Sequence, residues 1–215
     1  LEDPRTTVFF AIVGERHNGH QFVQDLYDRG VRAFVVSETV DQKKMPLAYF
    51  IFVENTLDAL QCVSANWRAN FDYPVVAVTG SNGKTIVKEW LHQLMDKDKQ
   101  VIRSPKSYNS QVGVPLSVWE MDSQHDIAII EAGISQPGEM VRLQRIIKPT
   151  IGLFTNLGTA HDENFKDPHQ KAREKLDLFQ QADILIYCSD HIVLDEELQN
   201  YPFKTTRFFR WSKRQ

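Results

Sequence analysis

The stretch that most restricts the fold of this chain is residues 75–85, which read Val-Val-Ala-Val-Thr-Gly-Ser-Asn-Gly-Lys-Thr. An apolar strand that enters a glycine-rich turn and then a helix is typical of a phosphate-binding loop. Gly80 and Gly83 let backbone N–H groups turn inward, and the start of the helix attracts an anion. Lys84 supplies a mobile positive charge and Thr85 a hydroxyl for Mg²⁺, so we expect a nucleotide phosphate site here.

The loop is shorter than the common phosphate-loop pattern, because Val78 stands where that pattern has its first glycine. The context supports the assignment. Residues 86–95 read as a helix whose apolar residues are expected on one stripe: Val87, Trp90, Leu91 and Leu94. The alternative is a strand-to-helix turn that binds nothing, but such a turn needs neither Lys84 nor Thr85.

Composition limits the class of protein. The 215 residues are 42% hydrophobic and 25% charged, which suits one large or two small globular domains. A net charge of -3 gives no reason to expect nucleic-acid binding. We see no signal peptide and no apolar run near the roughly 20 residues of a membrane span, so we expect a cytoplasmic protein without membrane contact. Cys62 and Cys188 stand in apolar segments, which predicts buried thiols and no disulfide.

Short apolar strands alternate with helical segments, which predicts an α/β fold with mostly parallel sheets covered by helices. Pro74 precedes the phosphate-loop strand and places a domain boundary near Tyr73. We therefore expect a small N-terminal α/β domain at residues 1–73 and a larger domain at residues 74–215. The expected strands are 8–13, 33–36, 49–53, 75–78, 100–103, 126–131, 151–155, 183–188 and 207–211, and the expected helices are 21–28, 56–70, 86–95, 114–120, 139–147 and 168–180.

Polar residues follow two further strands, at the end where parallel sheets bind ligands. Glu131 follows the apolar residues 127–130 and presents a carboxylate suited to Mg²⁺; a simple polar strand exit is the alternative. His161 lies beyond the strand 151–155. A lone loop histidine is more often structural or solvated, and Mg²⁺ prefers oxygen ligands, so His161 needs independent support.

Several motifs in order along the chain resemble the Mur ligases of peptidoglycan synthesis, and within that family the MurF-type enzymes. The motifs are residues 79–85, Ile-Glu-Ala-Gly at 130–133, Pro-Gly-Glu at 137–139, Thr-Asn-Leu at 155–157 with Ala160, His161 and Phe165, the segment 9–22, and Asn109 with Gly-Val-Pro at 113–115. The resemblance implies a small N-terminal UDP-sugar-binding domain followed by a P-loop central domain, which the chain contains incompletely. It also implies a C-terminal domain that is absent from this chain.

The resemblance further implies ATP and two Mg²⁺ ions as cofactors. The implied ATP-binding residues are Gly80, Ser81, Asn82, Gly83, Lys84, Thr85 and Asn109. The implied metal ligands are Thr85, Glu131, His161 and Lys175, and the implied catalytic residues are Lys84, His161 and Lys175. Lys175 would be carbamylated into a carboxylate-like ligand, with Lys171 as a neighbouring candidate. The implied UDP-sugar contacts are Arg16, Asn18 and His20.

The activity implied for the whole protein is the ATP-dependent joining of D-alanyl-D-alanine to UDP-N-acetylmuramoyl-tripeptide through an acyl phosphate. We expect a piece of a longer protein, inactive alone and related to ligase halves fused to an alanine racemase. Three alternatives stay open: a folylpolyglutamate synthase-like ligase, a generic P-loop kinase or ATPase, and a non-catalytic nucleotide-binding domain of a fusion protein. The segment 16–20 argues against the first, and His161 with Lys175 argues against the second.

Overall fold

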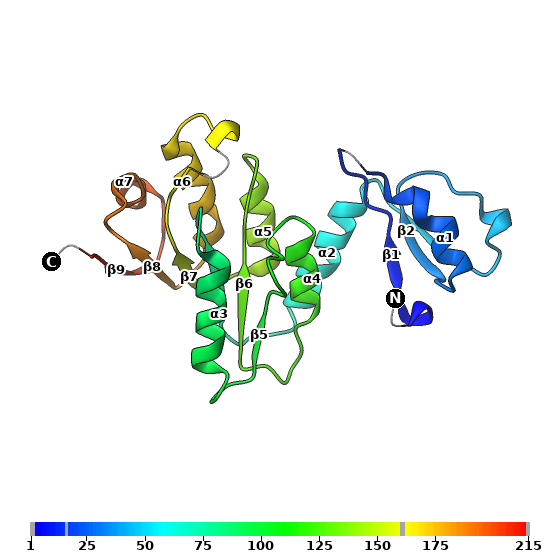
Figure 1. Cartoon of the computed structure of the whole chain (residues 1–215), viewed down its shortest axis with the longest axis horizontal. Helices are drawn as coiled ribbons and strands as arrows, with labels where there is room; N and C mark the ends of the chain where they lie inside the picture. The colour runs from blue at the N-terminus through cyan, green and yellow to red at the C-terminus, as the bar shows by residue number, and fades with distance from the viewer. Residues whose placement is uncertain (1–2, 16, 160–161, 214–215) are drawn as a thin grey trace. The chain divides into compact units, whose positions relative to one another are not determined.

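The structure is a computed structural model that describes residues 3–15, 17–159 and 162–213. It divides into two compact units, Leu1–Val63 and Ser64–Gln215. The division falls inside helix α2 (Thr56–Arg68), because the second half of that helix packs with the larger unit, where Trp67 contacts Phe71 and Trp119. The functional boundary near Tyr73 stays a prediction. Figure 1 follows the elements in chain order.

The smaller unit contains a three-stranded parallel sheet, in the order β1 (Val8–Phe10), β2 (Ala33–Val36) and β3 (Tyr49–Phe52). Short helices lie before and between its strands: η1 (Pro4–Thr6), η2 (Gly19–Phe22), α1 (Val23–Asp28) and η3 (Gln42–Lys44). Its core is built from Ala11, Val23, Val31, Phe34, Val36 and Met45. The Phe34 ring stacks on Phe50 with the ring centroids 5.4 Å apart, which joins the two neighbouring strands.

The larger unit contains a six-stranded sheet in the order β5 (Val101–Arg103), β6 (Ile127–Glu131), β4 (Val75–Thr79), β7 (Ile151–Phe154), β8 (Ile184–Cys188) and β9 (Arg207–Trp211). Every pair of neighbouring strands in this order is parallel. The predicted α/β class with helix-covered parallel sheets is therefore confirmed. The two strands beside β4 come later in the chain, so the loops that follow β4, β6 and β7 meet at one edge of the sheet.

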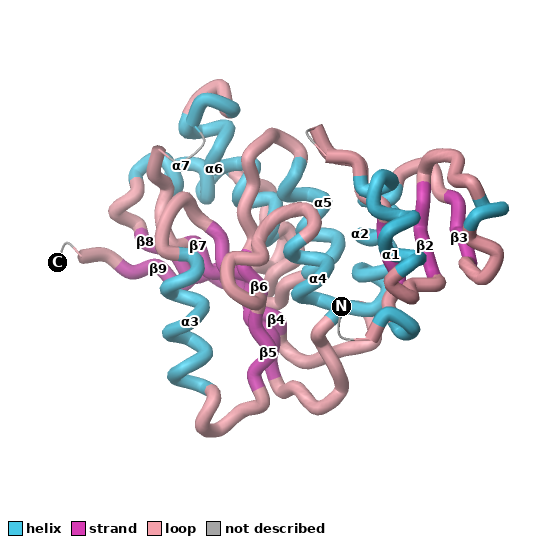
Figure 2. Tube along the Cα trace, turned by 45° about the vertical axis from the view of Figure 1, so that its right-hand side comes forward, coloured by secondary structure: helices cyan, strands magenta, loops and turns pink. Residues whose placement is uncertain are grey.

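The connections place helices on both faces of this sheet. The helices are α3 (Lys84–Met95), α4 (Gly113–Trp119), α5 (Glu139–Ile147), α6 (Pro168–Leu176) and α7 (Ile192–Asn200), with short turns η4 (Asp162–Asn164) and η5 (Asp177–Phe179). The chain leaves β4 for the edge strand β5 and then returns across β6 to β7. Because parallel crossovers are right-handed, this reversal leaves α3 on one face and puts α4, α5 and α6 on the other, as Figures 1 and 2 show.

The strand β4 lies in the core of the larger unit, because all of its residues are buried. Val75 and Ala77 belong to the larger apolar cluster on the α4–α6 face. Val76 and Val78 pack instead with α3 residues, which include Val87, Leu91 and Met95. A fully buried valine side chain contributes about 1.5–3 kcal/mol, so a central strand buried on both faces is a strong structural determinant.

Three sequence expectations are corrected here. The apolar residues of α3 do not form a single stripe against the sheet, because Trp90 and Leu94 are 63% and 74% exposed while Leu91 packs inward. The thiol-bearing Cys62 is exposed, although Cys188 is buried as expected, and neither forms a disulfide. Helix α7 was not expected from the sequence. Within the described part of the chain, no helix is long and apolar enough to cross a membrane.

Candidate active site

The glycine-rich loop lies between the end of β4 and the start of α3, as the sequence predicts. Two positive φ angles shape it, +140° at Gly80 and +78° at Gly83. At Gly80 a side chain is also excluded sterically, because an added Cβ would lie 2.1 Å from Thr155 Oγ1. At Gly83 the surrounding space is open, so only the backbone conformation favours glycine there.

A hydrogen-bonded cluster stands beside the loop at the ends of β4 and β6. Register pairs Val78 of β4 with Glu131 of β6, and Glu131 is fully buried. Thr85 Oγ1 donates to Glu131 Oε2 at 2.8 Å, and Asn109 Nδ2 donates to Glu131 Oε1 at 2.6 Å. The structure thus brings Thr85, Asn109 and Glu131 together, three of the residues that sequence reasoning placed at the phosphate and metal site.

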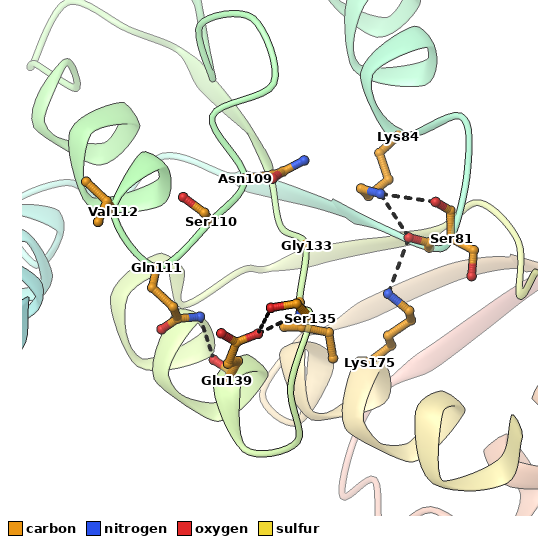
Figure 3. Close-up of a pocket in the computed structure, with 12 residues that line it drawn as sticks. Ser81, Lys84, Asn109, Ser110, Gln111, Val112, Gly133, Ser135, Glu139 and Lys175 are labelled. Carbon is orange, nitrogen blue, oxygen red and sulfur yellow. Dashed lines mark hydrogen bonds between the residues drawn. The ribbon is translucent and has the colours of Figure 1, made fainter. Parts of the chain in front are cut away.

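A cleft of about 320 Å³ opens between the loop and the segments that follow β5 and β6. Its described lining is Gly80, Ser81, Lys84, Asn109, Ser110, Gln111, Val112, Gly133, Ile134, Ser135, Glu139 and Lys175. Figure 3 shows the two lysines, Lys84 and Lys175, pointing toward the same part of the loop, with Gln111, Ser135 and Glu139 on the opposite wall. The cleft therefore combines two lysine side chains with polar donors and acceptors, a set suited to a phosphorylated ligand.

Lys84 folds back onto its own loop. Its Nζ donates to the Gly80 carbonyl at 3.1 Å and to the Ser81 carbonyl at 3.4 Å. Burial lowers the pKa of Lys84, and the charge of Glu131 opposes that shift. The backbone carbonyls hold the ammonium group at the cleft wall, where a phosphate would be a stronger partner than a neutral carbonyl.

The structure separates Lys175 from Lys171, the two α6 lysines between which sequence reasoning had to choose. Lys175 lines the cleft, and its Nζ lies 3.4 Å from the Gly80 carbonyl. Burial, followed by the charges of Lys84 and Lys171, lowers the pKa of Lys175 to about 7. Lys171 is also buried, but its Nζ donates to the Gly158 carbonyl at 2.6 Å. Lys175 is therefore the α6 lysine placed to act on a ligand in the cleft.

Two predicted site residues, Arg16 and His161, lie outside the described residues, so their roles stay predictions. In the described ranges, no group of three His, Cys, Asp or Glu side chains is gathered as a metal site. The cluster of Thr85, Asn109 and Glu131 depends instead on one carboxylate, one hydroxyl and one amide.

In the smaller unit, Asn18 and His20 meet the loop that follows β2. His20 Nε2 accepts the N–H groups of Ser37 at 3.0 Å and Glu38 at 3.1 Å. Its Nδ1 lies 2.8 Å from Asn18 Oδ1, and because Nε2 accepts, Nδ1 is assigned as the donor in this pair. Asn18 Nδ2 donates to Glu38 Oε1 at 2.8 Å. Both nitrogens of His20 are thus engaged within the protein, where they join the two loops, and the predicted UDP-sugar contacts of Asn18 and His20 stay predictions.

Sequence reasoning missed several neighbours of the predicted residues. Ser104 Oγ accepts the N–H of Glu131 at 3.0 Å, and Ser107 Oγ lies 3.3 Å from Thr85 Oγ1. Both serines follow β5, so the position after a parallel strand was a usable signal. Ser37 and Glu38 carry the same signal after β2. Thr155 follows β7 and carries this signal too, but its close approach to Gly80 was not predictable, because that approach depends on the packing of two loops.

A parallel sheet whose central strand leads through this loop into a helix, with a buried carboxylate on the adjoining strand, defines a P-loop nucleotide-binding domain. Residues 78–214 match the Mur ligase middle domain. The chain therefore belongs to the Mur ligase family.

Individual relatives agree with this assignment. The UDP-N-acetylmuramoyl-tripeptide–D-alanyl-D-alanine ligase of Synechocystis sp. is 39% identical over 154 residues, which cover 72% of this chain and 34% of that protein. The enzyme of the same name from Bacillus subtilis is 32% identical over 190 residues, 87% of this chain and 41% of that protein. The crystal structure of MurF ligase from Thermotoga maritima in complex with ADP superimposes with a TM-score of 0.83 at 25% identity, covering 100% of this chain and 50% of that one. The chain thus spans between a third and a half of the length of these relatives.

Proposed function

We propose that this chain is the nucleotide-binding part of an ATP-dependent ligase that adds D-alanyl-D-alanine to UDP-N-acetylmuramoyl-tripeptide, a step of peptidoglycan and cell-wall synthesis. The observation that carries the proposal is the buried Glu131, bonded to Thr85 and Asn109 directly beside the phosphate loop. The names of the relatives in Synechocystis sp. and Bacillus subtilis supply the substrates.

The loop would bind the ATP phosphates through its backbone and Lys84. The first N–H groups of α3 have no partner within a helix and point out of its start, which favours an anion. Residues 80–85 and Asn109 surround that position. The related Thermotoga maritima structure is a complex with ADP, which supports nucleotide binding by this chain.

Glu131 fits a divalent cation on chemical grounds. It is a fully buried carboxylate, and within the described residues its side chain is hydrogen-bonded to Thr85 and Asn109 but to no lysine or arginine. The charge of Lys84 acts on this carboxylate without a direct hydrogen bond to it. A buried anion that no cation contacts directly is costly, and oxygen ligands suit Mg²⁺. Thr85 and Glu131 would hold one Mg²⁺, and His161 with Lys175 would hold a second. Bound Mg²⁺ would neutralise charge on the phosphates as they approach a second anion.

Lys175 is suited to carbamylation. A pKa of about 7 leaves much of its amine neutral near pH 7, and only a neutral amine can attack CO₂. The new N–C bond forms as the amine loses one proton, which converts a cation into a carboxylate-like ligand. Such a group on the cleft wall would offer oxygen to Mg²⁺ where an ammonium would repel it.

In the reaction, the tripeptide carboxylate attacks the γ-phosphorus of ATP and ADP leaves, which gives an acyl phosphate. The amine of D-alanyl-D-alanine then attacks the acyl carbon, inorganic phosphate leaves, and the nitrogen loses a proton as the amide forms. The contribution of this chain is to position two anions and reduce their repulsion. Lys84 supplies positive charge at the loop, and Asn109 holds the Glu131 carboxylate in place at 2.6 Å. The wall opposite the two lysines, which includes Gln111 and Ser135, offers polar groups to the substrate that accepts the phosphoryl group.

We assign residues 1–73 to recognition of the UDP-sugar, through Arg16, Asn18 and the loop that His20 holds. The position of this loop at the carboxyl end of a parallel sheet supports the assignment. We place the protein in the cytoplasm, where ATP and UDP-linked precursors are available. The fused racemase and the C-terminal domain stay expectations, which the length of the intact protein would test.

The deciding experiment is a calorimetric titration of the intact protein with UDP-N-acetylmuramoyl-tripeptide, with either meso-diaminopimelate or lysine as the third residue. UDP alone and folate serve as controls. We expect saturable binding of one tripeptide nucleotide that is tighter than binding of UDP. Phosphate release from ATP should then require both the tripeptide nucleotide and D-alanyl-D-alanine.

The alternatives give different results in the same experiment. Folate binding without UDP-sugar binding would indicate a folylpolyglutamate synthase-like ligase. Phosphate release that does not need D-alanyl-D-alanine would indicate a kinase or ATPase. Nucleotide binding without any turnover would indicate a non-catalytic domain of a fusion protein.

A further inference from the structure

The segment Thr155–Gly158, directly after β7, lies along the phosphate loop and bonds to it repeatedly. Asn156 accepts the N–H of Ser81 at its carbonyl (2.9 Å) and the N–H of Asn82 at Oδ1 (3.0 Å). The Asn82 carbonyl in turn accepts Thr155 Oγ1 at 2.7 Å and Asn156 Nδ2 at 3.1 Å. The first half of the loop is therefore fixed at both backbone groups of Asn82.

These bonds divide the loop into two halves with different tasks. The N–H groups of Ser81 and Asn82 are directed at Asn156 and thus away from a ligand. The N–H groups of Gly83, Lys84, Thr85 and Ile86 stand at the start of α3 and have no hydrogen-bond partner among the described residues, as at the start of other helices. The first half is an anchor, and the second half is left to receive phosphate oxygens.

Steric contact makes the anchor specific. Thr155 Oγ1 occupies the space that a side chain at residue 80 would need, 2.1 Å from an added Cβ. The Gly158 carbonyl at the far end of the segment accepts Ser81 Oγ at 3.0 Å and Lys171 Nζ at 2.6 Å. Helix α6 thus holds the segment from one side while the segment holds the loop from the other.

We propose that Thr155 and Asn156 are positioning residues for the nucleotide: they hold the first half of the phosphate loop so that the start of α3 is presented to the phosphates. This inference rests on the proposed function of the loop. Neither residue lines the described cleft, so their effect on affinity acts through the shape of the loop. A loop held in its binding shape loses less conformational freedom when the ligand arrives.

The test compares substitutions that remove one side chain at a time. Thr155→Ala removes the hydroxyl that bonds to Asn82, and Thr155→Ser keeps it. Thr150→Ala is the matched control, because Thr150 Oγ1 accepts the N–H of Val75 at 3.0 Å at the opposite end of the same pair of strands. The measurements are the dissociation constant of ADP by calorimetry and the midpoint of thermal unfolding, both on the intact protein.

We expect Thr155→Ala to weaken ADP binding about fivefold, the factor that corresponds to one lost hydrogen bond. Asn156→Ala, which removes two side-chain bonds to Asn82, should weaken it further. Thr155→Ser, which keeps the hydroxyl, should bind ADP with an affinity within about twofold of the wild type. Thr150→Ala should lower the unfolding midpoint without changing ADP affinity, because its bonds lie far along the strands from the loop.

Unchanged ADP affinity in Thr155→Ala and Asn156→Ala would overturn the inference. Equal losses of affinity in Thr155→Ala and Thr150→Ala would also overturn it, since the effect would then follow general destabilisation. A wild-type protein that is folded but does not bind ADP would instead contradict the proposed function, and the inference with it. The two failures are distinguishable: if only the inference is wrong, the wild-type protein still binds ADP and the variants bind it equally well.

Discussion

The contact between Gly80 and Thr155 leads to the sharpest prediction about this fold, which concerns Gly80→Ala. The new methyl group would lie 2.1 Å from Thr155 Oγ1 and 2.9 Å from the Asn156 carbonyl oxygen. Neither neighbour can simply move away, because Thr155 is bonded to Asn82 and the Asn156 carbonyl is bonded to the N–H of Ser81. The backbone at residue 80 also has φ +140°, which an L side chain disfavours.

The expected cost follows from these terms. A residue held in such a backbone conformation costs about 1–3 kcal/mol, and overpacking of a well-filled site costs about another 1–3 kcal/mol. We therefore expect Gly80→Ala to lower the free energy of unfolding by about 4 kcal/mol. Gly83→Ala is the matched control: its φ is +78° but its surroundings are open, so about 1 kcal/mol is expected.

Urea denaturation of both variants, followed by circular dichroism, measures the difference. A double-mutant cycle then isolates the clash. Thr155→Ala in the Gly80→Ala background removes the hydroxyl that blocks the methyl group, so the double variant should be more stable than the sum of the two single losses predicts, by about 1–2 kcal/mol. The reasoning is refuted if Gly80→Ala costs no more than Gly83→Ala, or if the two substitutions at residues 80 and 155 are simply additive.

Three further predictions concern lysines. Lys84→Ala should abolish ligation by the intact protein and leave its circular dichroism spectrum unchanged; turnover at the wild-type rate would contradict the role of the loop. The lowered pKa of Lys175, about 7 against the ordinary 10.5, means that the unfolded chain binds more protons than the folded chain between these values. The free energy of unfolding should therefore rise with pH across that window, by at most about 1.4 kcal/mol per pH unit. Lys175→Met should reduce this rise when both proteins are denatured with urea at pH 7 and at pH 9.5. An equal rise in the wild type and the variant would contradict the lowered pKa of Lys175. Lys88 is fully buried and donates to the carbonyls of Ser104 (2.7 Å) and Lys106. Lys88→Met should therefore lower the free energy of unfolding, measured by urea denaturation, by about 3 kcal/mol. A loss below about 1 kcal/mol would argue against this anchoring of α3.

The strands of the larger sheet were predictable because burial on both faces produces unbroken apolar runs. The segments 75–78, 126–131 and 151–155 agree with β4, β6 and β7 to within one residue at each end. Helix α7 was missed, since its buried side combines Leu194 and Leu198 with the charged Glu197, while the apolar Ile192 is exposed. On α3, apolar residues surround much of the helix, and the sequence alone does not reveal which of two stripes faces the sheet.

The candidate site was predictable where chemistry follows directly after a strand. Lys84, Thr85, Asn109 and Glu131 were all named from the sequence, and the structure brings them around one cleft or beside it. The choice between Lys171 and Lys175 needed the structure, because both are buried on the same helix and only the fold shows that Lys175 lines the cleft while Lys171 donates to the Gly158 carbonyl. The steric contact between Gly80 and Thr155 was also visible only in the structure, since those residues are far apart along the chain.

The strand order has a consequence for how this domain loses structure. The phosphate loop follows β4, Glu131 ends β6, and the segment Thr155–Gly158 follows β7. These are three neighbouring strands inside the sheet, whereas every residue of the edge strand β9 is exposed. Amide protons of β4 should therefore exchange with solvent only when the whole domain unfolds, and those of β9 should exchange through local opening. The phosphate loop would then keep its shape after the sheet has frayed from β9, so nucleotide protection and edge-strand protection should be lost at different denaturant concentrations.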